Sequence, residues 1–70
     1  MGFEKRILNE IEPLLVVGNH VEFCNGTLFL ENVSGETGKR VYNRLVQILG
    51  KDSFRFNIYN RIDGFAVDFV

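Results

Sequence analysis

The sequence predicts an α+β fold: a two-layer sandwich in which two helices cover one face of a four-stranded, mostly antiparallel sheet. Three observations predict it. Two segments carry apolar residues at helical spacing, four short segments alternate apolar and polar residues, and the first half of the chain resembles the second. The expected order of elements is α-β-β-α-β-β in one domain that spans residues 1–70.

The internal similarity is clearest between Lys5–Leu15 and Lys39–Leu49. Lys, Arg, Asn and the final Leu coincide, and aliphatic residues share further columns. A strand-like run and a turn dipeptide follow each segment, Asn25-Gly26 in the first half and Asp63-Gly64 in the second. We interpret the halves, roughly residues 3–33 and 37–70, as two copies of one αββ unit.

Helical spacing predicts a first helix from Phe3 to about Leu15, on the stripe Phe3, Ile7, Ile11 and Leu14. Pro13 disfavours helical geometry at Glu12, so we expect this helix to end or kink there. The same spacing predicts a second helix on Val41, Leu45 and Ile48.

Small and polar residues flank this second helix. The segment before it, residues 34–38, has the composition of a loop, in which Ser34 or Thr37 can cap the helix. Gly50 is suited to end the helix.

The first hairpin has a single expected register. Asn25-Gly26 is a strong signal for a two-residue type I′ turn, which needs positive φ at both central positions. Such a turn pairs Phe23 with Leu28 and, in the same register, Val21 with Leu30, Glu22 with Phe29 and His20 with Glu31. The apolar residues of both strands then share one face.

The second hairpin joins a strand on Phe54, Phe56 and Ile58 to one on Phe65, Val67 and Phe69. A two-residue Asp63-Gly64 turn pairs Ile62 with Phe65, whereas a four-residue loop pairs Ile58 with Val67. We favour the longer loop because it gives Phe56 a partner in Phe69. Both registers keep the phenylalanines on one face.

Moving the first strand of a ferredoxin-like β-α-β-β-α-β unit to its end gives the same order of elements. A ferredoxin-like circular permutation of this kind predicts strand order 1-2-4-3, two parallel central strands and right-handed crossovers. The likeness is one of element order only. It predicts no function, since such folds carry unrelated activities.

Composition excludes several classes of protein. With one cysteine and one histidine in 70 residues, we expect no internal disulfide, no Cys/His zinc site and no cofactor. The net charge of −1 disfavours a strongly basic nucleic-acid binder. No apolar run reaches membrane-spanning length and no signal peptide is evident, so we expect a cytoplasmic protein without a membrane partner. The size also suits an accessory protein of a phage, although no residue identifies a source.

Two patterns suggest catalysis but are incomplete. The segment before the second helix resembles a phosphate-binding loop, yet Val33 replaces its first glycine and Arg40 its Ser or Thr. His20, Glu22 and Cys24 alternate onto one strand face, but residues two apart on a strand are nearly 7 Å apart, too far for a Cys–His pair. We therefore expect no enzyme activity.

Two binding hypotheses remain. In the first, a small domain self-associates as a homodimer or binds another protein through its sheet face or edge strands, with Phe29, Arg55, Tyr59 and Val70 as interface residues. In the alternative, anions or nucleic acid bind at two basic helix starts, Lys5-Arg6 and Lys39-Arg40, and on the Arg and aromatic residues of the sheet face, where Arg61 is a further candidate. Acidic residues on that face, Glu22, Glu31 and Asp68, disfavour the alternative.

Overall fold

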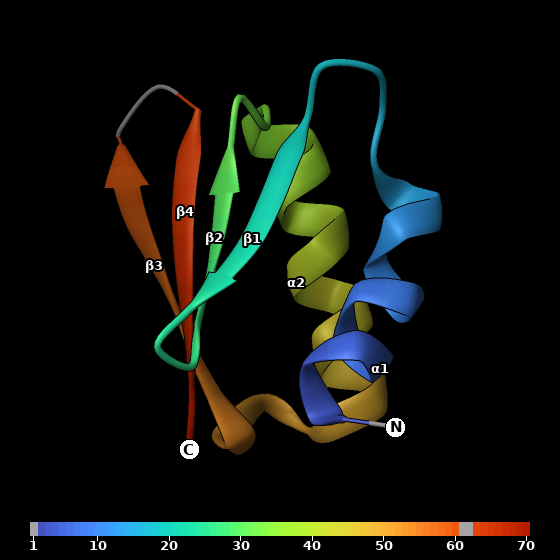
Figure 1. Ribbon diagram of the computed structural model, residues 1–70, viewed down its shortest axis with the longest axis vertical. Coiled ribbons are helices and arrows are strands. Elements are labelled where there is room, and N and C mark those ends of the chain that lie inside the picture. Colours follow the sequence, from blue (N-terminus) through green and yellow to red (C-terminus); the bar gives the residue numbers. More distant parts are fainter. Residues whose placement is uncertain (1, 61–62) are drawn as a thin grey trace.

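The computed structural model describes residues 2–60 and 63–70. Its elements are α1 (Phe3–Ile11), the single 3₁₀ turn η1 (Glu12–Leu14), β1 (His20–Cys24), β2 (Thr27–Glu31), α2 (Gly35–Leu49), the 3₁₀ turn η2 (Lys51–Ser53), β3 (Phe54–Asn60) and β4 (Gly64–Phe69). The strands form one sheet in the order β1-β2-β4-β3, and both helices lie on one side of it (Figure 1). The predicted two-layer α+β fold and its strand order are confirmed. Arg61 and Ile62 lie outside the described residues.

The first helix ends where proline predicts. α1 stops at Ile11, and Pro13 lies in η1, where a missing N–H costs less than inside a helix. Ile7 and Ile11 point into the core and are almost fully buried. The middle of the predicted helical stripe therefore packs on the sheet, whereas Phe3 at its start is 46% exposed.

The second helix begins earlier than predicted. Residues 35–38 are helical rather than a loop, and Ser34 is the N-cap, its Oγ accepting a hydrogen bond from the Thr37 N–H at 3.2 Å. Gly38 lies inside the helix because the Phe65 ring occupies the space beside it: a Cβ on Gly38 would come within 2.6 Å of Phe65 Cε2. Packing thus overrides the low helix propensity of glycine. Gly50, with φ of 90°, ends the helix as predicted.

The first hairpin matches its prediction in full. Asn25 and Gly26 have φ of 51° and 84°, as a type I′ turn requires. Phe23 pairs with Leu28, and the remaining predicted partners of β1 and β2 are also confirmed. As a result Leu28 and Leu30 are fully buried beneath the helices.

Both predicted registers of the second hairpin are wrong. Ile58 pairs with Phe65 and Phe56 with Val67, and the ladder shifts between Ile58 and Asn60. The observed register extends the ladder to the end of the chain, where the Val70 N–H donates to the Ser53 carbonyl at 2.9 Å. The predicted face is nevertheless right: Phe54 is buried, and the ring centroid of Phe56 lies 5.6 Å from that of Tyr42 on α2.

The expectation of two parallel central strands is also wrong, because β2 and β4 pair antiparallel. The strands β2 and β3, which α2 connects, are parallel to each other. The next strand in the chain, β4, lies between them in the sheet and is antiparallel to both. The parallel pair is therefore never adjacent, and all neighbouring strands in the sheet are antiparallel.

Candidate interaction surface

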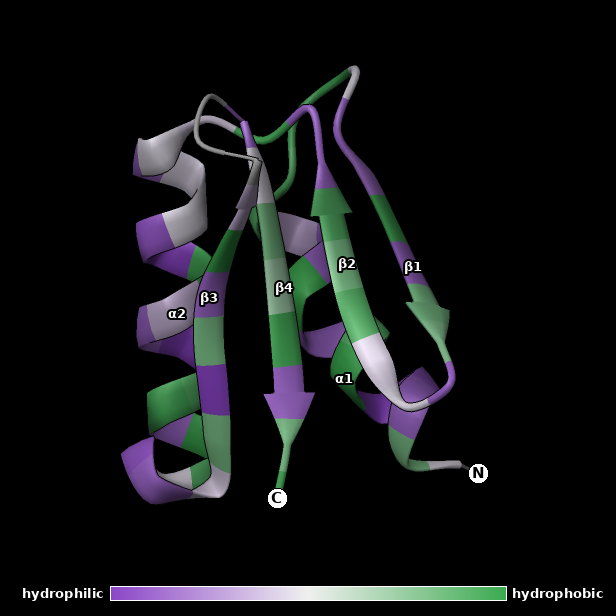
Figure 2. Ribbon diagram, turned by 90° about the vertical axis from the view of Figure 1, so that its left-hand side faces the viewer, coloured by the Kyte–Doolittle hydropathy of each residue, from purple (hydrophilic) through white to green (hydrophobic). Residues whose placement is uncertain are grey.

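The outer face of the sheet, opposite the helices, carries the side chains that alternate with the core residues. Strand pairing arranges them in rows that cross the sheet. The middle row is Glu22, Phe29, Ala66 and Asn57, and the next row toward the end of β4 is Cys24, Thr27, Asp68 and Arg55. In Figure 2 the sheet lies in front of the helices, β2 and β4 are mostly hydrophobic, and β3 alternates between hydrophobic and hydrophilic residues.

An aromatic pair crosses this face. The ring centroids of Phe29 on β2 and Tyr59 on β3 lie 5.3 Å apart at an interplanar angle of 69°, an edge-to-face arrangement. These strands are not neighbours, since β4 lies between them. Ala66 on β4 is small enough to let the two rings meet above it. Tyr59 remains 58% exposed, so the pair presents apolar surface to solvent.

The other two predicted interface residues lie away from this pair. Arg55 is exposed and lies opposite Asp68, whose carboxylate accepts a hydrogen bond from the Thr27 hydroxyl at 2.7 Å. Val70 follows β4 at the end of the sheet farther from Tyr59 and is 89% exposed. The structure thus brings Phe29 and Tyr59 together but places Arg55 and Val70 toward the opposite end of the face.

The polar residues of β1, His20, Glu22 and Cys24, are exposed to solvent. His20 Nε2 lies 3.3 Å from Glu22 Oε1, and Cys24 is exposed with a free thiol. Within residues 2–60 and 63–70, His, Cys, Asp and Glu side chains nowhere gather in the numbers that a metal ion needs. The contact of His20 with Glu22, rather than with Glu31 across the hairpin, was not predicted.

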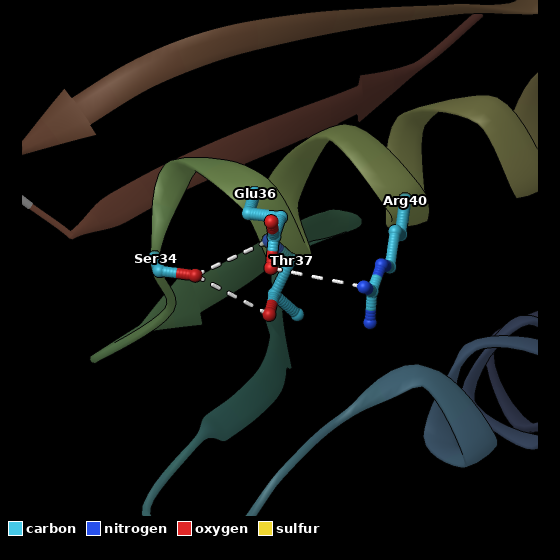
Figure 3. A network of polar contacts seen from close by, with 4 residues as sticks. All are labelled: Ser34, Glu36, Thr37 and Arg40. Atoms are coloured by element: carbon cyan, nitrogen blue, oxygen red, sulfur yellow. Dashed lines mark hydrogen bonds and ion pairs between the residues drawn. The ribbon is translucent and has the colours of Figure 1, made fainter.

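The two basic pairs lie far from each other. α1 and α2 run in opposite directions. Their N-terminal parts, which carry Lys5-Arg6 and Lys39-Arg40, therefore lie at opposite ends of the helix layer (Figure 1). At the start of α2, Arg40 Nη2 lies 3.7 Å from Glu36 Oε1, while Ser34 caps the helix (Figure 3). The helix start is therefore partly neutralised by its own residues. Anion binding there stays an untested prediction.

A groove between the helices was not anticipated from the sequence. Its volume is about 360 Å³, and it is lined by Glu10, Pro13, Leu14, Arg40, Asn43, Arg44 and Gln47. An ion pair between Glu10 and Arg44 crosses it. Glu10 and Arg44 occupy the same column of the two helical segments, but a shared column does not predict a contact.

In the part of the chain that the structure describes, neither helix combines the length and hydrophobicity that crossing a bilayer requires. Comparison with protein-family models, with curated proteins and with solved structures found no match to this chain. Its function must therefore be inferred from its own surface.

Proposed function

We propose that this protein is a small, non-enzymatic interaction module that self-associates through the outer face of its sheet. The observation that supports it is the Phe29–Tyr59 pair, held above Ala66 on the face opposite the helices. Aromatic residues are enriched at protein interfaces, where they supply large apolar contacts at low entropic cost. A domain of 70 residues also gains from burying further apolar surface against a partner.

The shape of the face suits a second copy of the chain. Phe29 on β2 and Ala66 on β4 lie directly opposite each other, one large and one small. A twofold axis that runs parallel to the strands between β2 and β4 places the Phe29–Tyr59 pair of each copy against the pair of the other, which covers Ala66. Both contacts of this isologous arrangement are then equivalent, and the aromatic pair of each copy packs against that of the other.

The size of the face sets the expected strength. Four strands spaced about 4.8 Å apart, with about six residues each at about 3.4 Å, form a face of roughly 15 by 20 Å. Two such faces bury an area at or below the lower end of stable interfaces, about 1,200 Å² in total. We therefore expect a dissociation constant in the micromolar range or weaker, and a dimer that forms reversibly.

Light scattering with sedimentation, over protein concentrations from micromolar to about millimolar, tests the proposal against the affinity scale. The wild-type protein should associate, and Phe29→Glu or Tyr59→Glu should weaken the association at least tenfold, since each places a charge in the apolar contact. Val17→Glu is the matched control, because Val17 is fully exposed in a loop away from the sheet face. A wild-type monomer at every concentration, or association that both sheet-face variants leave unchanged, would contradict the proposal.

A further inference from the structure

The edges of the sheet suggest a second mode of self-association. We propose that β1 of one copy pairs with β3 of the next copy, head to tail, so that the sheets of successive copies join through main-chain hydrogen bonds. This inference shares with the proposed function only the premise that the chain self-associates. It uses the edges of the sheet rather than its face. Because the side chains of Glu22 and Arg55 also lie on that face, its test separates the two by the size of the assemblies.

The outward backbone groups of both edges follow from the hydrogen-bond pattern. Because the Val70 N–H bonds to the Ser53 carbonyl, antiparallel alternation directs the backbone groups of Arg55 and Asn57 toward β4. The N–H and C=O groups of Phe54, Phe56 and Ile58 therefore point away from the sheet. On β1, the type I′ turn fixes Cys24 and Thr27 as a bonded pair, which leaves the backbone groups of Val21 and Phe23 pointing outward.

The directions of the two edge strands are compatible. Since every neighbouring pair is antiparallel, β1 and β3 of one copy run in opposite directions. A copy moved sideways by the width of the sheet, and by two residues along the strands, therefore presents β3 antiparallel to β1 of its neighbour without being turned over. Its helices remain on the same side, so the two-layer arrangement continues.

One register joins the edges with complementary charges. Pairing Val21 with Phe56 of the next copy also pairs Phe23 with Phe54, and all four residues direct their backbone groups outward. Glu22 then lies opposite Arg55 of the next copy in a non-hydrogen-bonded pair, where side chains approach most closely. Ile58, which is 70% exposed on the helix side of β3, is covered by the neighbouring Val21. In contrast, pairing Val21 with Phe23 between two β1 strands would oppose Glu22 to Glu22.

The helix layer favours the same arrangement. In Figure 2, α2 extends beyond the β3 edge, whereas α1 lies behind β1 and β2 and does not extend beyond the β1 edge. Two copies joined through β3 would place their α2 helices in the same space. Head-to-tail pairing instead brings the α2 overhang of one copy to the β1 edge of the next, beyond which α1 does not extend. The spacing agrees, because four strands repeat at about 19 Å and two packed helices need about 16–20 Å.

A charge exchange tests this pairing. Glu22→Arg and Arg55→Glu each place like charges opposite each other, and each variant alone should need at least tenfold more protein to form species larger than a dimer, a change of about 1.4 kcal/mol. An equimolar mixture of the two variants restores opposite charges at every joint and should assemble as the wild type does. Glu31→Arg is the control, since Glu31 is exposed on β2 and not on an edge. Sedimentation measures the assemblies, and circular dichroism checks the fold.

Several outcomes overturn the inference. If either single variant assembles like the wild type, or if the mixture of folded variants does not recover assembly, the head-to-tail pairing is wrong. If the wild type stops at a dimer that Phe29→Glu dissociates, the pairing is wrong while the proposed sheet-face contact stands. Should Arg55→Glu unfold beside Asp68, the double variant Arg55→Glu with Asp68→Asn replaces it in the same mixture.

Discussion

The two halves of the molecule have the same order of elements but differ in the length of the helix and in the regularity of the hairpin. The first half has a short helix, α1, and a tight hairpin; the second has a longer helix, α2, and a hairpin with a shifted register. Ile7 and Val41 share a column of the internal alignment, as do Ile11 and Leu45, and all four side chains are buried. The comparison teaches that the core positions match while the ends of the elements diverge.

The contact between Glu10 and Arg44 extends this comparison. These two residues also share a column, and they meet across the groove between the antiparallel helices. At this point, residues from equivalent positions of the two aligned segments face each other. Pro13 stands where the second helix has Gln47, and it ends α1 short of the length that α2 reaches.

The largest expected effects come from truncating matched core positions. Ile11→Ala and Leu45→Ala each remove a fully buried side chain, and each should lower the free energy of unfolding by about 2–5 kcal/mol. Asn9→Ala and Asn43→Ala, in an exposed column, should stay within about 0.5 kcal/mol. Urea denaturation measures all four variants. If one of the two core variants lowers the free energy of unfolding by less than about 1 kcal/mol, the two halves do not contribute equally to core stability.

A smaller effect separates the glycines of α2. Gly38→Ala should lower the free energy of unfolding by about 1–3 kcal/mol, because the new methyl group meets the Phe65 ring. Helix propensity alone would change stability in the other direction by up to about 1 kcal/mol. Gly35→Ala is the control, since nothing lies within 4 Å of its Cβ position.

Thermal unfolding of both glycine variants checks this prediction. In a Phe65→Leu background the cost of Gly38→Ala should shrink, because the ring that the methyl group meets is gone. A stabilised Gly38→Ala variant in the wild-type background would show that Phe65 moves aside freely.

The smallest expected effects compare the two helix starts. Ser34 caps α2 with its side chain, whereas Gly2 at the start of α1 has no side chain to offer. Ser34→Ala should lower the free energy of unfolding by about 1 kcal/mol, and Gly2→Ser should raise it by a few tenths of a kcal/mol. Chemical denaturation of the two variants and of their combination measures both changes. Equal and opposite effects would indicate that the two helix starts contribute alike to stability, contrary to this expectation.

Much of the fold could be predicted because local chemistry fixes it. The Asn25-Gly26 turn specifies the first hairpin to the residue, and Pro13 and Gly50 mark where their helices end. The register of the second hairpin could not be read in this way. Alternation fixes which face Phe56 and Val67 occupy, but every shift by two residues preserves that face, and the Asp63-Gly64 dipeptide fits several loop lengths.

The start of α2 and the candidate surface depended on contacts between distant residues. The sequence alone assigns Gly38 to a loop, because its contact with the Phe65 ring is known only from the structure. Phe29 and Tyr59 could be assigned to one face by alternation, but their contact across β4 depends on which strands are neighbours and on the size of Ala66. The helix groove likewise depends on how the two helices pack.

α1 begins and β4 ends at the same end of the molecule (Figure 1), and the rings of Phe3 and Phe69 touch with centroids 5.1 Å apart. A short peptide linker could therefore join the termini without disturbing the helices or the sheet. Cutting that closed chain at the Asn25-Gly26 turn would make β2 the first strand and β1 the last. The relinked molecule would then have the element order β-α-β-β-α-β along its sequence and would keep the same core.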